Sequence, residues 1–167
     1  PDDLQAAGLS RSAKILVTGG NASLRGSGVL QNLERVLDGY AKKIADSIPH
    51  TPTKASADAL AERVRQSRPD CIIAVGGGAV LDTTKIAKLW SASKAPVIAV
   101  PTTAGTGAET TPFATLWDYA KGLKHSVESP DILPSLIYLD PRFTHSMSKV
   151  QTVATAIDSL SHALESL

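Results

Sequence analysis

Short apolar runs alternate along this chain with stretches in which apolar residues recur at helical spacing. The apolar runs predict β-strands at residues 14–18, 43–48, 71–75 and 96–100, and the periodic stretches predict helices at 28–37, 55–66 and 79–90. The run CIIAV at 71–75 is apolar at every position, which is typical of a strand buried on both faces of a sheet. Alternating strands and helices indicate a parallel sheet covered by helices, the doubly wound α/β class.

The pattern changes after residue 100. Three short runs, at 113–117, 125–128 and 136–139, predict a hairpin or edge strands. Ser148, with Gln151 three residues later, forms the capping-box pattern of a helix start and predicts a long helix over 149–167. We therefore expect an α/β domain over residues 1–143 and the beginning of a second, helical domain over residues 144–167. Because the chain lacks an initial methionine and ends inside a helical pattern, we expect it to be a fragment of a longer protein.

Composition excludes several classes of function. The chain has 167 residues, 43% of them hydrophobic, so it can bury a core, and its formal net charge of +1 gives no reason to expect nucleic acid or an anionic membrane as a partner. No apolar run is long enough to cross a bilayer. The single cysteine, Cys71, cannot form an intrachain disulfide. A cytoplasmic protein is expected.

Two glycine-rich turns each follow a predicted strand. Gly76, Gly77 and Gly78 stand before the helix at 79–90, where backbone amides and the positive end of the helix dipole can meet a phosphate. The turn at 101–107 (PTTAGTG) adds three threonine hydroxyls. Either turn alone could be a bare strand-to-helix connection, but two such turns at neighbouring strand ends favour a bound dinucleotide.

The last predicted helix carries Asp158 and His162, four residues apart. Residues at this spacing share one helix face, and a carboxylate with an imidazole is half of a workable site for a divalent metal ion. The alternative is a solvated pair on the helix surface.

Four segments together resemble the iron-containing (group III) alcohol dehydrogenase family: GGGAVLDTTKIAK, PTTAGTGAETTPFATLWD, LDPRFTHSMS and TAIDSLSHALESL. The resemblance runs in order over nearly the whole chain. It implies an N-terminal dinucleotide-binding α/β domain followed by an all-helical domain, with metal and substrate between them. The implied activity is metal-dependent hydride transfer between a nicotinamide cofactor and a small alcohol or aldehyde, in a homodimer.

The resemblance also implies roles for single residues. The implied cofactor-binding residues are Gly77, Gly78, Ala79, Val80, Asp82, Thr102, Thr103, Thr106, Thr111, Thr115 and Lys124. Asp82 could instead be an ordinary first-turn acid of its helix, and Lys124 an ordinary surface lysine. Phe113 stands where many members of the family carry a small polar residue.

The cofactor is expected to be NADP rather than NAD. Members that use NAD usually place an aspartate after the first strand, whereas this chain has Gly19, Gly20, Asn21, Ala22 and Ser23 there. A turn without the carboxylate does not repel a 2′-phosphate, and we expect Gly19 and Ser23 to help bind it. The alternative is that a turn without the acid has no preference, so that the protein uses either NADP or NAD.

The resemblance makes Asp158 and His162 two of four metal ligands, the metal being Fe²⁺ or Zn²⁺. In the family the other two ligands are histidines of the helical domain, and His50, His125 and His145 lie outside the matching metal-binding motif, so we expect the chain as given to bind metal weakly and to be inactive alone. Related alternatives are the glycerol dehydrogenases and the maleylacetate reductases, and the stretch TPFATLWDYAKGLKHSV also resembles phosphonoacetaldehyde reductases. A non-catalytic nucleotide-binding module is the alternative from a different class.

Overall fold

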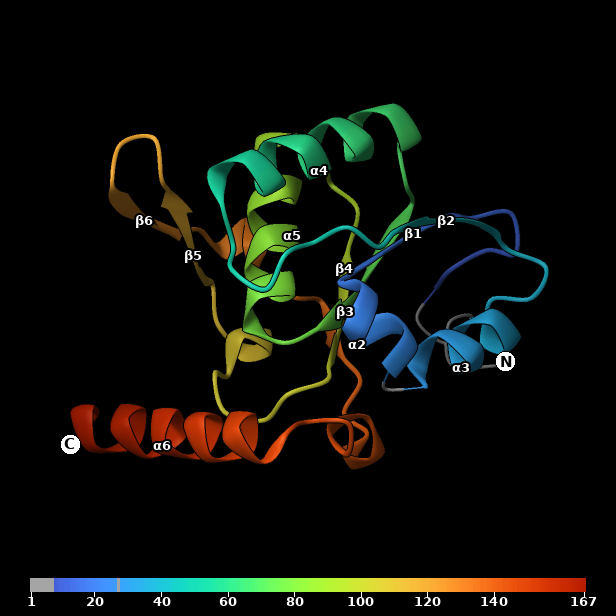
Figure 1. The fold of residues 1–167 in the computed structure, drawn as a ribbon. Helices are drawn as coiled ribbons and strands as arrows, with labels where there is room; N and C mark the ends of the chain where they lie inside the picture. The colour runs from blue at the N-terminus through green and yellow to red at the C-terminus, as the bar shows by residue number, and fades with distance from the viewer. Residues whose placement is uncertain (1–7, 27) are drawn as a thin grey trace.

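A computed structural model describes residues 8–26 and 28–167, in which five parallel strands form a central sheet (Figure 1). Their order across the sheet is β2-β1-β3-β4-β7. The strands are β1 (Lys14–Gly19), β2 (Ala41–Ala45), β3 (Cys71–Gly76), β4 (Val97–Pro101) and β7 (Leu136–Ile137). β2 lies on one side of β1, and β3 and the later strands lie on the other side. The order in which strands are added to the sheet therefore reverses its direction at β1.

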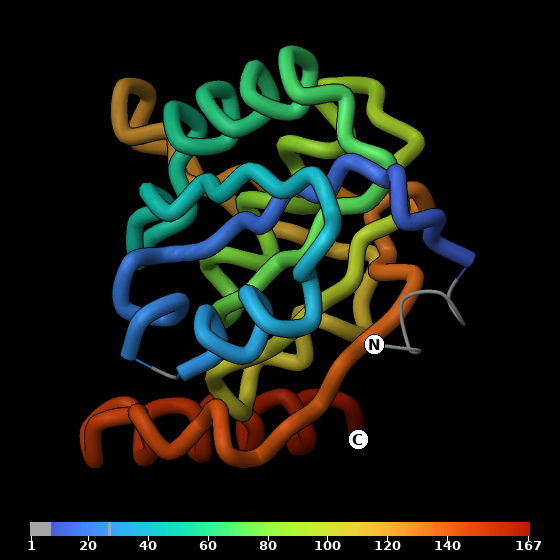
Figure 2. Tube along the Cα trace, turned by 90° about the vertical axis from the view of Figure 1, so that its right-hand side faces the viewer, coloured from blue at the N-terminus to red at the C-terminus, as the bar shows by residue number. Residues whose placement is uncertain are grey.

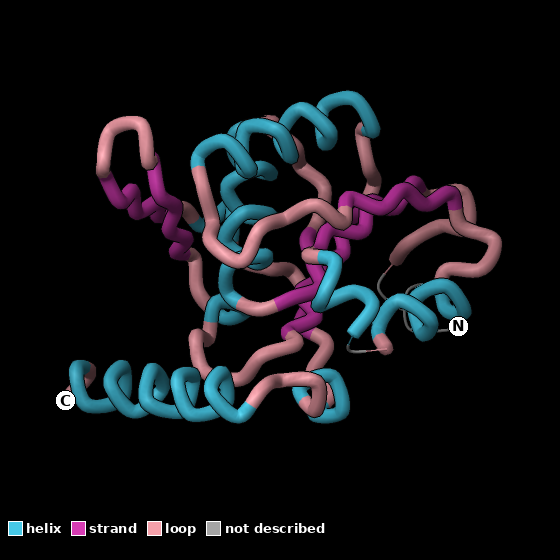
Figure 3. The backbone as a smooth tube through the Cα atoms, viewed as in Figure 1, coloured by secondary structure: helices cyan, strands magenta, loops and turns pink. Residues whose placement is uncertain are grey.

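Helices cover both faces of this sheet, as Figure 3 shows by the helical segments on either side of the strands. They are α2 (Asn21–Gly26), α3 (Val29–Val36), α4 (Lys54–Ser67) and α5 (Gly78–Trp90). Alternate residues of the strands point to opposite faces. Ile73 and Val75 pack with Leu24 and Val29 of α2 and α3, whereas Ile72 and Ala74 pack with α4 and α5. The doubly wound α/β prediction is therefore confirmed.

The remaining elements lie at the edges. β5 (Phe113–Asp118) and β6 (Leu123–Glu128) form an antiparallel hairpin that projects from the body. The short helices η1 (Ala108–Thr110) and η2 (Pro130–Ile132) connect strands, and η3 (Pro141–Thr144) follows β7. α6 (Lys149–Glu165) runs along one end of the molecule (Figures 1 and 2). Within the described ranges, no helix is both long and apolar enough to span a membrane.

Most element boundaries agree with the sequence pattern, although β6 begins two residues earlier than predicted and β7 ends two residues earlier. Two further differences have a physical reason in the structure. β2 begins two residues earlier than predicted and ends at Ala45, because its parallel pairing with β1 runs from Lys14 opposite Ala41 to Thr18 opposite Ala45. The segment after Gly20, predicted as an open turn, forms the short helix α2, which packs Leu24 into the core. The sequence pattern does not predict α2, because a helix of six residues is too short to show a periodic repeat of apolar positions.

Helix α6 is largely exposed, with Thr155 and Asp158 partly buried. The Ser148 hydroxyl accepts a hydrogen bond from the Gln151 amide at 3.2 Å, as the capping pattern predicts. No α6 residue is buried in the described structure, and Val150, Val153 and Leu160 are each more than half exposed. The division of the chain at residue 143 stays a prediction.

Helix α5 is fixed to its surroundings by polar side chains. The buried Thr84 and Thr18 hydroxyls lie 2.8 Å apart, which ties the helix to β1. Asp82 accepts hydrogen bonds from the Thr115 amide at 3.0 Å and hydroxyl at 3.3 Å, which ties the helix to β5. Burial raises the pKa of the Asp82 carboxyl, while the bonds from Thr115 and the charges of Lys85 and Lys124 lower it.

The third tie is Lys85, which is only 1% exposed. Its ammonium group donates to three backbone carbonyls, those of Ala108, Thr111 (2.8 Å) and Phe113 (2.9 Å). Three acceptors match the three N–H bonds of a charged lysine, since a neutral amine has only two. Burial lowers the pKa of Lys85, and the neighbouring carboxylates Asp82 and Glu109 raise it. Lys85 thus holds the chain after β4 against α5.

Replacing Lys85 with methionine should lower the free energy of unfolding by about 3 kcal/mol, because the side-chain volume is kept while three carbonyls lose their donor. Urea denaturation would measure the change. Lys88→Met is the matched control, because Lys88 lies one turn later, is only partly buried and donates to a single carbonyl, that of Asp131. We expect the control to cost less than about 1 kcal/mol. Equal losses in the two variants would contradict this role for Lys85.

Candidate functional site

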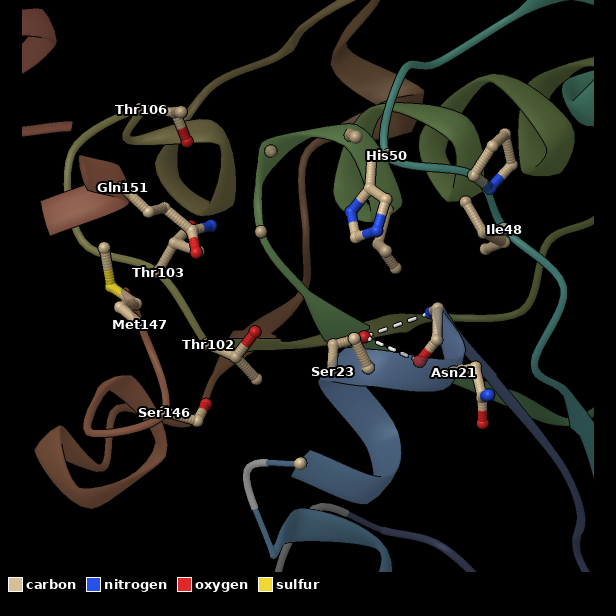
Figure 4. A pocket seen from close by; sticks show the side chains of 18 of the residues that line it. Asn21, Ser23, Ile48, His50, Thr102, Thr103, Thr106, Ser146, Met147 and Gln151 are labelled. Carbon is tan, nitrogen blue, oxygen red and sulfur yellow. Dashed lines mark hydrogen bonds between the residues drawn. The ribbon is translucent and has the colours of Figure 1, made fainter. Parts of the chain in front are cut away.

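A cavity of about 790 Å³ lies at the carboxyl ends of four neighbouring strands (Figure 4). It is lined by Gly20 after β1, Asp46 after β2, Gly77 after β3 and Thr102 after β4. We call it the carboxyl-end cavity. It lies at the point where chain order reverses, which is where open α/β sheets bind ligands, and its volume suits an organic cofactor.

The first turn of α5 forms one wall of the carboxyl-end cavity. Its N-cap is Gly77, which offers no side chain to cap the helix, so the first backbone N–H groups are available to an anion. A Cβ atom on Gly77 would lie 2.7 Å from Thr103 Oγ1, and one on Gly78 would lie 3.1 Å from Thr106 Oγ1. The threonine-rich loop therefore packs directly on the glycine turn, and the two motifs form a single cradle of backbone N–H groups and hydroxyls.

Eight of the predicted site residues line the carboxyl-end cavity. These are Ser23, Gly77, Gly78, Ala79, Val80, Thr102, Thr103 and Thr106. Figure 4 shows Thr102, Thr103 and Thr106 on one side of the cavity, opposite Asn21 and Ser23. The two sides come from segments some eighty residues apart in the chain.

The turn after β1 differs in detail from the expectation. Gly19 lies outside the cavity lining, where a Cβ would come within 2.6 Å of Leu24 Cγ and 2.9 Å of the Val75 carbonyl oxygen. Glycine is thus required there by the packing of α2. The Ser23 hydroxyl donates toward the carbonyls of Gly20 (2.9 Å) and Val75 (3.1 Å) and accepts from the Gly20 amide (3.0 Å). Its hydrogen bonds stabilise the turn.

Four other predicted cofactor residues lie outside the cavity lining. Asp82 and Thr115 bind each other, and Thr111 accepts from Lys85 through its carbonyl, so all three take part in the ties between α5 and the chain that follows β4. Lys124 lies on β6 opposite Trp117 and is exposed. Their predicted cofactor contacts stay predictions.

The candidate metal ligands lie on α6. Asp158 Oδ1 and His162 Nε2 are 3.6 Å apart, and both side chains are about half exposed. The described part of the chain contains no group of three or more His, Cys, Asp or Glu side chains placed to hold a metal ion. The role of Asp158 and His162 as metal ligands stays a prediction.

Helix α6 contacts the threonine-rich loop at Gly105. Gly105, in the threonine-rich loop, has φ of +146°, and a Cβ there would come within 2.5 Å of the Thr155 carbonyl oxygen. Its own carbonyl accepts a hydrogen bond from the Ser159 hydroxyl at 3.2 Å. One loop thus contacts both the glycine turn of α5 and the helix that carries Asp158 and His162.

Sequence reasoning missed several residues of the carboxyl-end cavity. Asp46, Ser47 and His50 follow β2, and Gln151 and Thr155 come from α6. Asp46 could have been found, because the carboxyl ends of neighbouring parallel strands share one edge of the sheet. Figure 4 shows His50 and Gln151 on opposite sides of the cavity, a proximity that no local motif encodes.

Comparisons with known proteins agree with this architecture. The profile of the family described as iron-containing alcohol dehydrogenase matches residues 2–141. Phosphonoacetaldehyde reductase from Streptomyces viridochromogenes is 35% identical over 140 residues, which cover 70% of this chain and 35% of that protein. Mitochondrial hydroxyacid-oxoacid transhydrogenase from Xenopus laevis is 37% identical over 154 residues, which cover 78% and 33%. The chain therefore spans about a third of the length of these relatives.

Solved structures give the same result. Sulfoacetaldehyde reductase from Bifidobacterium kashiwanohense, solved in complex with NAD⁺, superimposes with a TM-score of 0.85 at 31% identity, covering 98% of this chain and 47% of that one. NADH-dependent butanol dehydrogenase A from Thermotoga maritima gives a TM-score of 0.87 at 25% identity, covering 98% and 45%. By sequence and by fold, the chain belongs to the iron-containing alcohol dehydrogenase family.

Proposed function

We propose that this chain is the dinucleotide-binding part of an oxidoreductase that transfers a hydride between a nicotinamide cofactor and a small alcohol or aldehyde. The observation that carries the proposal is the cradle, in which the uncapped start of α5 at Gly77 meets Thr103 and Thr106 of the next loop. Amide N–H groups and hydroxyls bind a diphosphate without adding net charge. Family membership supports the same function.

In this proposal the residues of the cradle bind and orient the cofactor. The first-turn amides of α5 hold the diphosphate, and Thr102, Thr103 and Thr106 hold phosphate and ribose oxygens. The ties from Asp82 and Lys85 keep the segment 108–115 at a fixed distance from that diphosphate. When bound, the nicotinamide would supply the hydride chemistry and the metal would polarise the substrate oxygen.

Asp158 and His162 are the proposed metal ligands of this chain. A carboxylate oxygen and an imidazole nitrogen suit Fe²⁺ or Zn²⁺. We propose that further ligands from outside the described residues complete the coordination, and that the 167-residue chain alone is inactive.

The proposed cofactor is NADP(H), since no carboxylate follows β1 directly. The proposed substrate is a small aldehyde, and the names of the two acetaldehyde-reductase relatives suggest one with an anionic phosphonate or sulfonate group. A homodimer and a cytoplasmic location stay predictions.

Replacing Gly77 with alanine should weaken nucleotide binding at least about tenfold, because the new methyl group would displace Thr103 from the cradle. Quenching of Trp90 and Trp117 fluorescence, or calorimetry, would measure the dissociation constant of NADPH. Circular dichroism would check that the variant remains folded. Unchanged affinity in a folded variant would refute the cradle.

The unmodified chain should bind NADPH about tenfold or more tightly than NADH, since the turn after β1 lacks the usual acid. Titrations with the two cofactors under the same salt concentration would test this. Preference for NADH would contradict the cofactor assignment and leave the cradle itself intact. Failure to bind either cofactor would refute the proposed function.

Replacing His162 with glutamine should weaken Zn²⁺ binding to the chain about tenfold, because one of two metal donors is lost. Calorimetric titration with Zn²⁺ would measure the affinity without any catalytic assay. His125→Gln is the matched control, since His125 lies on the β5–β6 hairpin. If the two variants lost affinity equally, the ion would be bound elsewhere or nonspecifically.

A further inference from the structure

The adenosine end of the proposed cofactor site contains a charge pair contributed by two different segments. Arg25, near the end of α2, lies 3.8 Å from Asp46, the residue that follows β2 (Arg25 Nη2 to Asp46 Oδ2). Arg25 Nε also donates to Asn21 Oδ1 at 2.8 Å. Asn21 and Asp46 both line the carboxyl-end cavity. These two wall residues therefore hold the Arg25 guanidinium at the rim of the cavity.

Strand pairing explains why these groups meet. β1 and β2 are parallel neighbours, and beyond their ends Gly20 forms an isolated bridge with Ser47. The Ile48 amide also donates to the Gly19 carbonyl at 3.2 Å. The residue after β2 is therefore brought beside the turn after β1, and Asp46 supplies from the neighbouring strand the carboxylate that this turn lacks.

Other groups at this end are poorly placed to bind a phosphate. The Ser23 hydroxyl and the Gly20 amide bind each other. Among the described residues that line the cavity there is no lysine or arginine, and Asp46 is the sole carboxylate. Arg25 contacts two residues of this wall, Asn21 and Asp46, so the local charge balance depends on the Arg25–Asp46 pair.

We propose that Arg25 and Asp46 together read the substituent at the 2′ position of the adenosine ribose, Arg25 selecting a 2′-phosphate and Asp46 a 2′-hydroxyl. This inference rests on the proposed function, since it requires a dinucleotide in the carboxyl-end cavity. It adds Arg25 and Asp46 as the residues that set the preference between NADP(H) and NAD(H). Neither residue is one of the glycines or the serine of the turn after β1.

The chemistry of the two side chains supports this division. A guanidinium binds phosphate oxygens with two parallel N–H donors, and a carboxylate can only accept, as from a ribose hydroxyl. The Arg25 and Asp46 side chains are 65% and 44% exposed. Ion pairs this exposed contribute little to stability, so a 2′-phosphate can replace Asp46 as the partner of Arg25 at small cost. Asp46 then opposes the phosphate by like-charge repulsion, which makes the preference adjustable.

Two nucleotides that differ only in the 2′-phosphate provide the test, namely 5′-AMP and 2′,5′-ADP. Their dissociation constants would be measured by calorimetry on the 167-residue chain and on the variants Arg25→Gln and Asp46→Asn. Arg25→Gln should weaken binding of 2′,5′-ADP about tenfold and change 5′-AMP little. Asp46→Asn should strengthen binding of 2′,5′-ADP severalfold and weaken 5′-AMP, so that the affinity ratio moves in opposite directions in the two variants.

Asp131→Asn is the matched control, since Asp131 pairs with Lys94 at 4.0 Å on the surface and lies outside the cavity lining. It should leave the ratio unchanged. If 5′-AMP and 2′,5′-ADP bind but neither variant changes their ratio relative to this control, the inference is overturned while the proposed function stands. If neither nucleotide binds the unmodified chain, both are overturned.

Discussion

The geometry of the cradle depends on how α5 is held in place. The uncapped start of α5 presents its N–H groups in a defined geometry because the helix is held by buried side chains and by three polar ties. Thr84 fixes α5 to β1, while Asp82 and Lys85 fix it to the segment after β4. Burying a charged lysine is costly unless every N–H finds an acceptor, and here three carbonyls supply them. The same bonds that satisfy Lys85 also position the chain beside the cradle.

The electrostatics of the carboxyl-end cavity follow from this arrangement. Its walls offer an anion dipoles, from the helix start at Gly77 and the threonine hydroxyls, rather than lysine or arginine side chains. A site of this kind accepts a diphosphate without strongly distinguishing its substituents. In the proposed function, discrimination between the two cofactors falls to the Arg25–Asp46 pair, which carries the formal charges at the edge of the cavity. Affinity and selectivity would then depend on different residues.

The threonine-rich loop connects the cradle to α6. In this loop, Thr103 contacts Gly77 at the start of α5, and Gly105 contacts Thr155 of α6. Because Gly105 has a backbone conformation that L side chains rarely adopt and leaves no room for a Cβ, the distance between the cradle and the helix with Asp158 and His162 is set at that residue. In an enzyme of the proposed kind, that distance governs how the cofactor faces the substrate.

The sequence by itself determined the class of fold, the order of its strands and helices, and the two motifs that form the cradle. These features are local: periodicity reports which faces are buried, and glycines and threonines after a strand report a turn that can approach a ligand. The tertiary structure alone decided which side chains meet. Asp46 is twenty-six residues from Gly20 but lines the same cavity because β2 pairs with β1. Ser23 also lines the cavity, and its hydroxyl forms hydrogen bonds within its own turn. Lys85 reads as one more lysine in an amphipathic helix, and only packing reveals that it is buried. Local patterns fix backbone conformation, whereas strand pairing and burial choose the partners, and these depend on residues far apart in the chain.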